Sequence, residues 1–265
     1  MSKQKIQGKV VFSGRDTFGE LTVADKDGIR SLYFGEGIVQ SSLKLGHPSV
    51  LLMDYSQAML TPLLFNERPE RVLVVGLGGG SLVNFLLERC PDCAVHAIEI
   101  SPAVIRVAHD YFDLPRQNSR LQVLQADARE AVREMEASGL LFDLILLDAF
   151  DEDGPAAVLM QEDFLISCKR LLRKNGICSI NLWTWPRGNF FETYEMIGSV
   201  FGGNAGKIPL EESYQNVVVL ACDDASRYAD LMSYRARARQ MQRKWGVNFP
   251  TFLMRIGWQR SAAEP

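Results

Sequence analysis

The chain has 265 residues and a formal net charge of −3 at pH 7; 47% of its residues are hydrophobic and 23% are charged. This composition is ordinary for a globular protein, and the small negative charge argues against a general affinity for nucleic acids or anionic membranes. No run of residues reaches the roughly 18 apolar residues of a membrane-spanning helix, and the polar N-terminus lacks the apolar segment of a signal peptide. We therefore expect a cytoplasmic protein with no nucleic acid or membrane partner.

Residues 1–65 predict a small β-rich N-terminal domain built of hairpins. Short, partly alternating runs of apolar residues are typical of strands, and they occur here at 9–13, 19–24 and 31–34. The turn residues Asp27 and Gly28 separate two of these runs, as expected for a hairpin. The rest of the chain, residues 66–265, is predicted to form a second domain.

The second domain opens with the most informative stretch of the chain, VLVVGLGGGSL at residues 72–82. Valine and leucine without alternation are typical of a strand that is buried on both faces of a parallel sheet. Four glycines within five positions follow this strand: Gly76, Gly78, Gly79 and Gly80. Glycines let the backbone turn sharply and approach a ligand closely. With a helix expected at 81–89, the stretch predicts a nucleotide-type binding loop, and the lack of a following Gly-Lys-Ser/Thr argues against a P-loop NTPase.

Beyond the glycine loop, predicted strands alternate with predicted helices. Strands are expected at 94–100, 121–125, 142–148 and 177–183, and helices at 102–111, 128–137 and 161–174. This alternation implies the α/β class, with a doubly wound, mostly parallel sheet covered by helices on both faces. A helix near 190–201 and a strand near 216–221 are expected to add antiparallel strands at the sheet edge, before a basic helical tail at 228–244.

The five cysteines give no sign of a structural framework. An odd number of thinly spread cysteines argues against disulfides. Cys90 and Cys93 form a C-x-x-C pair, but no second pair of cysteines or histidines lies at the spacing of a zinc site. We expect no bound metal, and the sequence leaves the role of this pair open.

Acidic residues follow the predicted strands at their carboxyl ends, where this class of fold binds ligands. Glu99 lies about 20 residues beyond the glycine loop, at the position of an acid that binds ribose hydroxyls. Asp127 ends the next strand, where it can accept a hydrogen bond from an adenine amino group. Asp148, Asp151 and Asp153 cluster after the following strand. Like charges and partial desolvation raise the pKa of a carboxylate, which suits proton abstraction from an ammonium.

These motifs and their order resemble the spermidine synthase (polyamine aminopropyltransferase) family. The resemblance spans roughly residues 17–222 and is carried by FGELTVADKDGIRSLYFGEGIVQSS, VLVVGLGGGSL, HAIEISPAVIRVA, LQADARE and FDLILLDAFDEDGP. It implies an S-adenosylmethionine-methyltransferase-like Rossmann fold behind a small β-rich domain. It also implies a transferase, often a homodimer, that moves an aminopropyl group from decarboxylated S-adenosylmethionine to an amine such as putrescine.

The resemblance further implies roles for individual residues. Asp148 would be the catalytic aspartate, with Tyr55 as an active-site tyrosine. Asp151 and Pro155 would bind the amine substrate. The nucleoside donor would be bound by residues from both domains: Gln40, Gly76, Gly78, Gly80, Ser81, Glu99, Asp127 and Ala128.

One departure from the family's pattern bears on the donor. The family usually reads GGGDG, and its aspartate pairs with the amine of the aminopropyl group, whereas residues 78–82 here read GGGSL. Ser81 neither neutralises an ammonium nor repels the carboxylate of intact S-adenosylmethionine. Three interpretations therefore stay open: an aminopropyltransferase, an S-adenosylmethionine-dependent methyltransferase on the same fold, and a non-catalytic nucleoside-binding relative. The sequence does not determine the donor, the acceptor or the oligomeric state.

Overall fold

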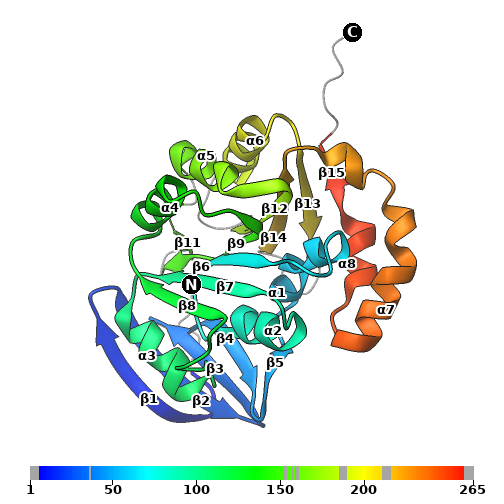
Figure 1. The fold of residues 1–265 in the computed structure, drawn as a ribbon. Coiled ribbons are helices and arrows are strands. Elements are labelled where there is room, and N and C mark those ends of the chain that lie inside the picture. The colour runs from blue at the N-terminus through cyan, green and yellow to red at the C-terminus, as the bar shows by residue number, and fades with distance from the viewer. Residues whose placement is uncertain are drawn as a thin grey trace.

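The computed structural model describes residues 6–35, 37–151, 154–156, 158, 161–184, 190–210 and 216–259. A five-stranded antiparallel sheet near the N-terminus lies beside an eight-stranded sheet that helices cover on both faces (Figure 1). In addition, β10 (Phe150–Asp151) and β11 (Gly154–Pro155) pair in a two-stranded ribbon. None of the helices in the described part of the chain has the length and hydrophobicity needed to cross a bilayer.

The N-terminal sheet is a meander in which each strand pairs with the next. Its strands are β1 (Lys9–Asp16), β2 (Gly19–Lys26), β3 (Ile29–Phe34), β4 (Ile38–Lys44) and β5 (His47–Leu51). The sequence predicts the first three of these strands but not the last two. The alternation of β4 is hidden because two consecutive polar residues, Ser41 and Ser42, are both buried. β5 is short and begins with His47 and Pro48, which masks its β character.

The larger sheet has a parallel centre and an antiparallel edge, in the order β15-β13-β14-β12-β9-β6-β7-β8. The parallel strands are β6 (Arg71–Val75), β7 (Ala94–Glu99), β8 (Leu121–Gln125), β9 (Phe142–Leu147) and β12 (Leu172–Trp183). The antiparallel strands are β13 (Ala205–Pro209), β14 (Asn216–Cys222) and β15 (Gly257–Trp258). β6 lies between β9 and β7 with four of its residues buried, which confirms the interior strand predicted before the glycine loop.

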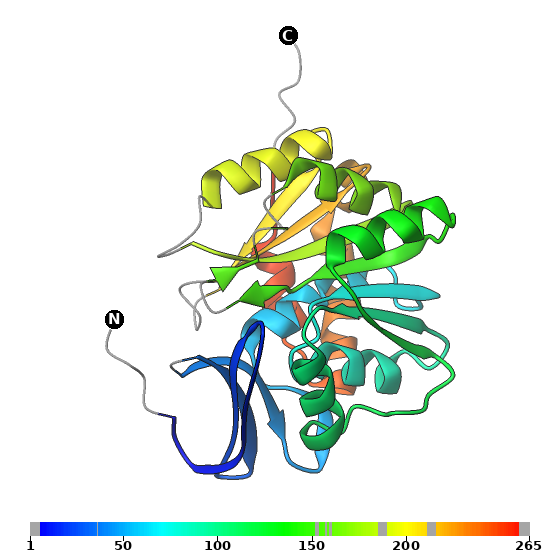
Figure 2. The ribbon, with the colours of Figure 1, turned by 90° about the vertical axis from the view of Figure 1, so that its left-hand side faces the viewer.

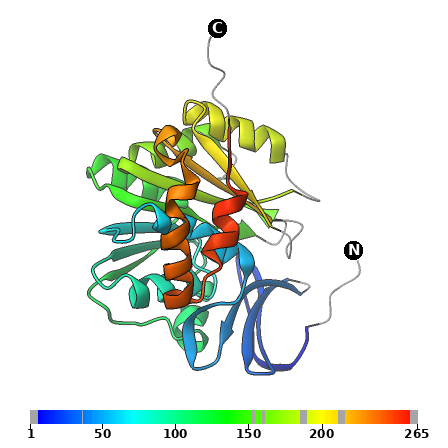
Figure 3. The ribbon, with the colours of Figure 1, turned by 90° about the vertical axis from the view of Figure 1, so that its right-hand side faces the viewer.

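Helices cover the two faces of the larger sheet unequally. One face is packed by α4 (Ala128–Ala137), α5 (Glu162–Arg170) and α6 (Phe190–Val200). The other is packed by α1 (Asp54–Met59), α2 (Ser81–Arg89), α3 (Pro102–Tyr111), α7 (Arg235–Trp245) and α8 (Phe249–Arg255). Short 3-10 helices occur at Thr61–Leu64, Ala225–Tyr228 and Leu231–Tyr234. Figure 3 shows α7 and α8, in orange and red, side by side on this second face.

One predicted helix is too long. The sequence predicts a helix over 161–174, but α5 ends at Arg170 and β12 begins at Leu172. Leu172 pairs with Phe142 of β9, and the register then shifts before Ile177. The apolar sequence Leu171-Leu172 fits a helix and a strand equally well, so only pairing with β9 decides where the helix ends.

The N-terminal sheet packs below the carboxyl-terminal half of the parallel strands (Figure 2). Leu32 and Leu43 of this sheet are fully buried and belong to the same cluster of apolar side chains as Phe85 and Phe112 of the α/β part. The hydrophobic core is therefore continuous across the junction. The division into domains 1–65 and 66–265 stays a prediction.

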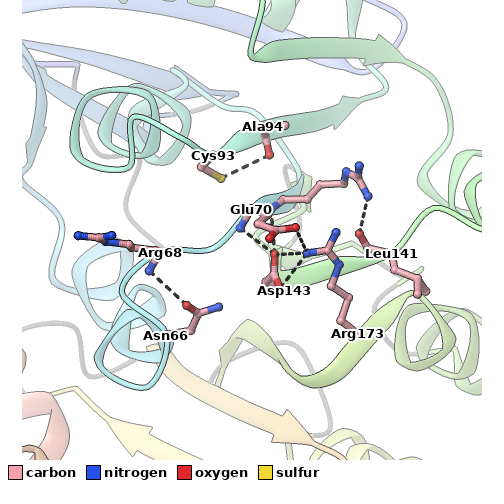
Figure 4. Close-up of polar contacts among 9 residues, drawn as sticks. Asn66, Arg68, Glu70, Cys93, Ala94, Leu141, Asp143 and Arg173 are labelled. Atoms are coloured by element: carbon pink, nitrogen blue, oxygen red, sulfur yellow. Dashed lines mark hydrogen bonds and ion pairs between the residues drawn. The ribbon is translucent and has the colours of Figure 1, made fainter.

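A network of charged residues ties together the amino ends of three parallel strands (Figure 4). Asp143 of β9 accepts hydrogen bonds from the backbone N–H groups of Glu70 and Arg71, at 2.8 and 2.9 Å. Arg173 of β12 pairs with the carboxylates of both Glu70 (2.7 Å) and Asp143 (3.2 Å). Because the Asp143 side chain is only 15% exposed, its removal would leave two backbone donors and a guanidinium short of an acceptor.

We expect Asp143→Ala to lower the free energy of unfolding by about 2–3 kcal/mol, the scale for charge-assisted hydrogen bonds that are lost from a part-buried site. Glu70→Ala is the matched control, since its side chain is 77% exposed and its backbone N–H is retained. Glu70→Ala should lower the free energy of unfolding by less than about 1 kcal/mol. Urea denaturation of the three proteins measures both values. Equal losses in the two variants would contradict the role given to Asp143.

Candidate active site

A cavity of about 340 Å³ lies at the carboxyl ends of β6, β7, β8 and β9, and the N-terminal sheet supplies its opposite wall. Its volume is in the range of small-molecule sites. Nine of the predicted site residues line it: Gln40, Tyr55, Gly76, Gly78, Ser81, Glu99, Asp127, Ala128 and Asp148. Gly80 does not line the cavity; it precedes α2 in a left-handed conformation (φ 76°) and packs against Leu114. The side chains of Asp151 and Pro155 lie outside the described residues.

Two glycines of the loop are required by the close approach of other segments. A Cβ atom at Gly76, whose φ is 88°, would lie 2.2 Å from the carbonyl oxygen of Asp148. A Cβ atom at Gly79 would lie 2.7 Å from Ser41 Oγ in β4. Any side chain at these positions would displace backbone or the packed sheet. The two glycines therefore let the end of β9 and the N-terminal sheet close around the cavity.

Glu99 is held as an acceptor at the end of β7. Its Oε2 accepts a hydrogen bond from Leu77 N at 3.0 Å and its Oε1 accepts one from Ser101 N at 2.9 Å. Burial raises the pKa of Glu99, and the backbone hydrogen bonds oppose that rise. The backbone N–H groups of Gly78 and Ile100 also contribute hydrogen bonds, and together these donors fix the carboxylate at the cavity wall. A carboxylate presented in this way suits the two hydroxyls of a ribose.

Asp127 and Ala128 offer an acceptor and a donor side by side. Asp127 is the N-cap of α4, and its Oδ1 accepts a hydrogen bond from Arg129 N at 2.8 Å. This bond fixes the carboxylate at the cavity wall. The N–H of Ala128, at the first position of the helix, has no acceptor within the helix. Such a pair is complementary to the amino group and a neighbouring ring nitrogen of adenine.

Tyr55 and Gln40 connect α1 with the N-terminal sheet. The Tyr55 hydroxyl donates a hydrogen bond to the backbone oxygen of Gln40 at 3.1 Å. Burial raises the pKa of Tyr55 well above its usual value, and the charges of Asp148 and Asp54 add to this rise. The Gln40 Nε2 is buried and has no acceptor among the described residues. A buried donor without a partner is costly, and a ligand in the cavity would supply the missing acceptor.

Asp148 follows β9 and has a carboxyl with a strongly raised pKa. Burial raises its pKa to about 7, although a hydrogen bond from Asn181 opposes the rise. Asn181 Nδ2 lies 2.9 Å from Asp148 Oδ1. A carboxylate that titrates near neutral pH is suited to accept a proton in catalysis.

The wall beside Ser81 is neutral. Its Oγ lies 3.0 Å from Ser41 Oγ, and Ser41 and Ser42 both line the cavity with it. Hydroxyl groups donate and accept hydrogen bonds but carry no charge. Among the described residues, these three serines therefore offer hydrogen bonds but no charge of either sign.

Sequence reasoning missed several contributors to the site, among them Asp16 and Asn181. Asp16 at the end of β1 lines the cavity and accepts a hydrogen bond from Ser101 Oγ at 2.5 Å, which joins the N-terminal sheet to the start of α3. In the sequence, Asp16 has the pattern of an ordinary turn residue, so nothing pointed to a site. Asn181 had a usable signal, because an amide within the apolar strand sequence ICSINLW needs a buried partner.

The cysteines take no part in the cavity. All five are free and buried, and burial raises the pKa of Cys90 to about 11 and that of Cys93 to about 12. A thiol with a raised pKa is a poor nucleophile and a poor metal ligand. In the described ranges, no three residues of the His, Cys, Asp and Glu types gather to hold a metal ion.

Comparison with known proteins defines first the fold and then the family. A crystal structure of spermidine synthase in complex with the transition-state analogue AdoDATO superposes with a TM-score of 0.73 at 20% identity, over 92% of this chain and 85% of that one. This match confirms the predicted Rossmann-like fold with its β-rich N-terminal part.

Residues 54–185 match the family model of the spermine/spermidine synthase domain. The polyamine aminopropyltransferase of Chromobacterium violaceum is 33% identical over 237 residues, which cover 89% of both chains. The chain therefore belongs to the polyamine aminopropyltransferase family of transferases, as the sequence motifs predicted. A human eEF1A lysine and N-terminal methyltransferase is 29% identical over 157 residues, which cover 56% of this chain and 22% of that protein.

Proposed function

We propose that this protein transfers an aminopropyl group from decarboxylated S-adenosylmethionine to an amine acceptor. The observation that carries the proposal is that Glu99, Asp127 and Asp148 line one cavity although they follow three different strands. The first two suit the ribose and adenine of the donor, and the third suits a base. A nucleoside and a nucleophilic nitrogen can therefore meet in one acidic crevice. Membership of the aminopropyltransferase family supports the same reaction.

In this reaction the amine nitrogen attacks the aminopropyl carbon that is bonded to the sulfonium sulfur. The C–N bond forms while the C–S bond breaks, and the electron pair of the C–S bond goes to sulfur to give methylthioadenosine. A sulfonium leaving group needs neither a metal ion nor an acid. Much of the acceleration is expected from holding the two reactants in line.

Asp148 is proposed to be the base. Alkylamines have a pKa near 10, as the lysine side chain does, so the acceptor arrives mostly as an unreactive ammonium. Asp148 would accept a hydrogen bond from this ammonium and take its proton, which frees the nitrogen lone pair that then attacks the carbon. Tyr55 hydrogen-bonds to Gln40 at the same wall of the cavity and would orient the amine against the sulfonium.

Further parts of the proposal rest on the family resemblance. Asp151 and Pro155, in the ribbon after β9, are proposed to hold the acceptor, with Asp151 pairing with the distant ammonium of a diamine. Gly80 would contribute to donor binding by shaping the loop. Action in the cytoplasm as a homodimer stays a prediction.

A second candidate function is methyl transfer from intact S-adenosylmethionine. The specific observation in its favour is the uncharged wall formed by Ser41, Ser42 and Ser81, because no carboxylate there repels the donor's own carboxylate. Similarity to a methyltransferase over part of the chain points the same way. Methyl transfer would use the same nucleoside site and the same base.

We expect the purified protein to form methylthioadenosine from decarboxylated S-adenosylmethionine and a diamine. Incubation of the protein with each donor and a panel of amines, followed by mass spectrometry of the nucleoside product, tests this. S-adenosylhomocysteine as the product would establish methyl transfer instead. If neither product forms while calorimetry shows that a donor binds, the protein is a nucleoside-binding relative without this activity.

We expect Ser81→Asp to shift donor preference toward the decarboxylated form, because a carboxylate there attracts its ammonium and repels the carboxylate of the intact donor. The ratio of the two dissociation constants should change by about tenfold or more, equivalent to about 1.4 kcal/mol. Ser81→Ala, which removes the hydroxyl without adding charge, is the control. A ratio that is the same in all three proteins would show that this wall does not contact the differing end of the donor.

We expect Asp148→Asn to reduce turnover by about 10²-fold or more, the scale for a lost general base, without weakening donor binding. In the native protein, Asp148 must lose its proton to act as a base, so kcat/KM should fall as the pH drops below about 7. In Asp148→Asn the break near pH 7 should be absent, and kcat/KM should instead fall steadily with decreasing pH over the whole range, because only the neutral fraction of the amine can react. Initial rates from pH 5.5 to 9 measure both effects. Native turnover in the variant would remove Asp148 from the mechanism.

A further inference from the structure

Behind Asp148, two buried asparagines form a chain of hydrogen bonds that leads away from the cavity. Asn181 Nδ2 donates to Asp148 Oδ1 at 2.9 Å, and Asn216 Nδ2 donates to Asn181 Oδ1 at 2.9 Å. Asn181 is 1% exposed and Asn216 is 8% exposed. Neither asparagine lines the cavity. Any influence that they have on chemistry must therefore pass through Asp148.

The sheet register explains why these three residues meet. Ile180 of β12 pairs with Leu147 of β9 in parallel, so the next residues, Asn181 and Asp148, lie side by side. Across the antiparallel pair of β12 and β14, Asn181 is opposite Val218, and Asn216 is its diagonal neighbour on the same face. Diagonal pairs are within reach of side chains of this length. The chain of amides thus crosses three adjacent strands.

The direction of these hydrogen bonds has a chemical consequence. An amide has a donor end and an acceptor end, and its NH₂ group can only donate. Because Asn216 donates to the Asn181 oxygen, it holds that oxygen away from Asp148 and turns the Asn181 NH₂ group toward it. A carboxylate accepts from this NH₂ group, whereas a protonated Oδ1 would meet a second donor. The arrangement therefore favours the ionised carboxyl.

We propose that Asn181 and Asn216 are positioning residues that hold Asp148 as an oriented carboxylate, with Oδ1 bound to the sheet and Oδ2 left for the amine. This proposal deepens the proposed function, and its catalytic part rests on Asp148 being the base. Asn216 acts indirectly, since it sets the orientation of the Asn181 amide and does not itself contact Asp148.

The other influences on Asp148 either favour its protonated form or come from groups that carry no charge at neutral pH. Burial at the end of β9 favours the protonated form. From α1, which packs against β12 and β14, Tyr55 interacts electrostatically with Asp148, and its raised pKa keeps it uncharged at neutral pH. No cation is among the causes that shift the pKa of Asp148 in the described part of the chain. The amide of Asn181 is therefore the group that offsets burial.

The test is a direct titration of Asp148 by NMR in protein labelled with ¹³C at the aspartate carboxyl carbons. The Asp148 signal is assigned by its absence from Asp148→Asn. We expect Asn181→Leu to raise the pKa of Asp148 by at least one unit, because the donor to Oδ1 is lost. We expect Asn216→Leu to raise it by a smaller amount, because the Asn181 amide is then free to turn its oxygen toward Asp148.

The double variant separates a relay from a general disturbance of the sheet. If Asn216 acts through Asn181, then adding Asn216→Leu to Asn181→Leu should cause no further shift. Ser179→Ala is the matched control, since Ser179 is fully buried on the same face of β12 and its hydroxyl has no partner in the described ranges. It should leave the titration unchanged. An unshifted pKa in Asn181→Leu, or an equal effect of Asn216→Leu in both backgrounds, would overturn the proposal.

Kinetics give a second readout if Asn181→Leu does not fold, because the shorter, polar Asn181→Ser variant can replace it. In either variant the acid limb of kcat/KM should move to higher pH, so that activity lost at pH 7 is largely recovered at pH 9, while the dissociation constant of the donor is unchanged. A uniform loss at every pH would indicate damage to the fold and contradict the positioning role. The NMR titration needs no turnover, so it can contradict the positioning role of the asparagines while the proposed transfer reaction stands. It can equally support the positioning role if the transfer reaction is not observed.

Discussion

The site depends on one constraint, the close approach of β6 and β9 at their carboxyl ends. Only a glycine at position 76 allows it, because a Cβ atom there would lie 2.2 Å from the carbonyl oxygen of Asp148. That approach places Asp148 at the cavity wall beside Gly76, where packing partly shields its carboxyl from water. The resulting desolvation raises its pKa to about 7. Binding loop and base are therefore parts of a single packing arrangement.

The N-terminal sheet supplies the wall of the cavity that faces the α/β part. It contributes Gln40 and two of the three wall serines, Ser41 and Ser42, and Asp16 ties it to the start of α3 through Ser101. Gly79 leaves the space into which Ser41 fits. Because the apolar core continues across this junction, packing holds the two walls of the cavity together. A nucleoside donor would therefore meet preformed walls, which lowers the cost of ordering on binding.

The buried polar groups at the two ends of the parallel strands differ in how fully they are hydrogen-bonded. At the amino ends, Asp143 is fully paired with backbone donors and Arg173, which suits a purely structural role. At the carboxyl ends, Asp148 is held by a single amide and Gln40 Nε2 has no acceptor in the described part of the chain. Unsatisfied polar groups of this kind cost stability and are expected where a ligand binds.

The sequence by itself determined the alternating strands and helices of the parallel sheet, the glycine loop and the acids at the strand ends, since these depend on local periodicity and on residue types with few alternative uses. It also determined the family, through the order of the motifs. Only the tertiary structure decided the end of α5, the strands β4 and β5, and the parts played by Asp16 and Asn181. Each of these depends on residues that are distant in the chain. The end of α5 depends on pairing with β9, and β4 depends on the burial of its serines. The part played by Asp16 depends on contact with Ser101, and that of Asn181 on the neighbouring carboxyl of Asp148. Local sequence carries no information about such partners until the sheet register brings them together.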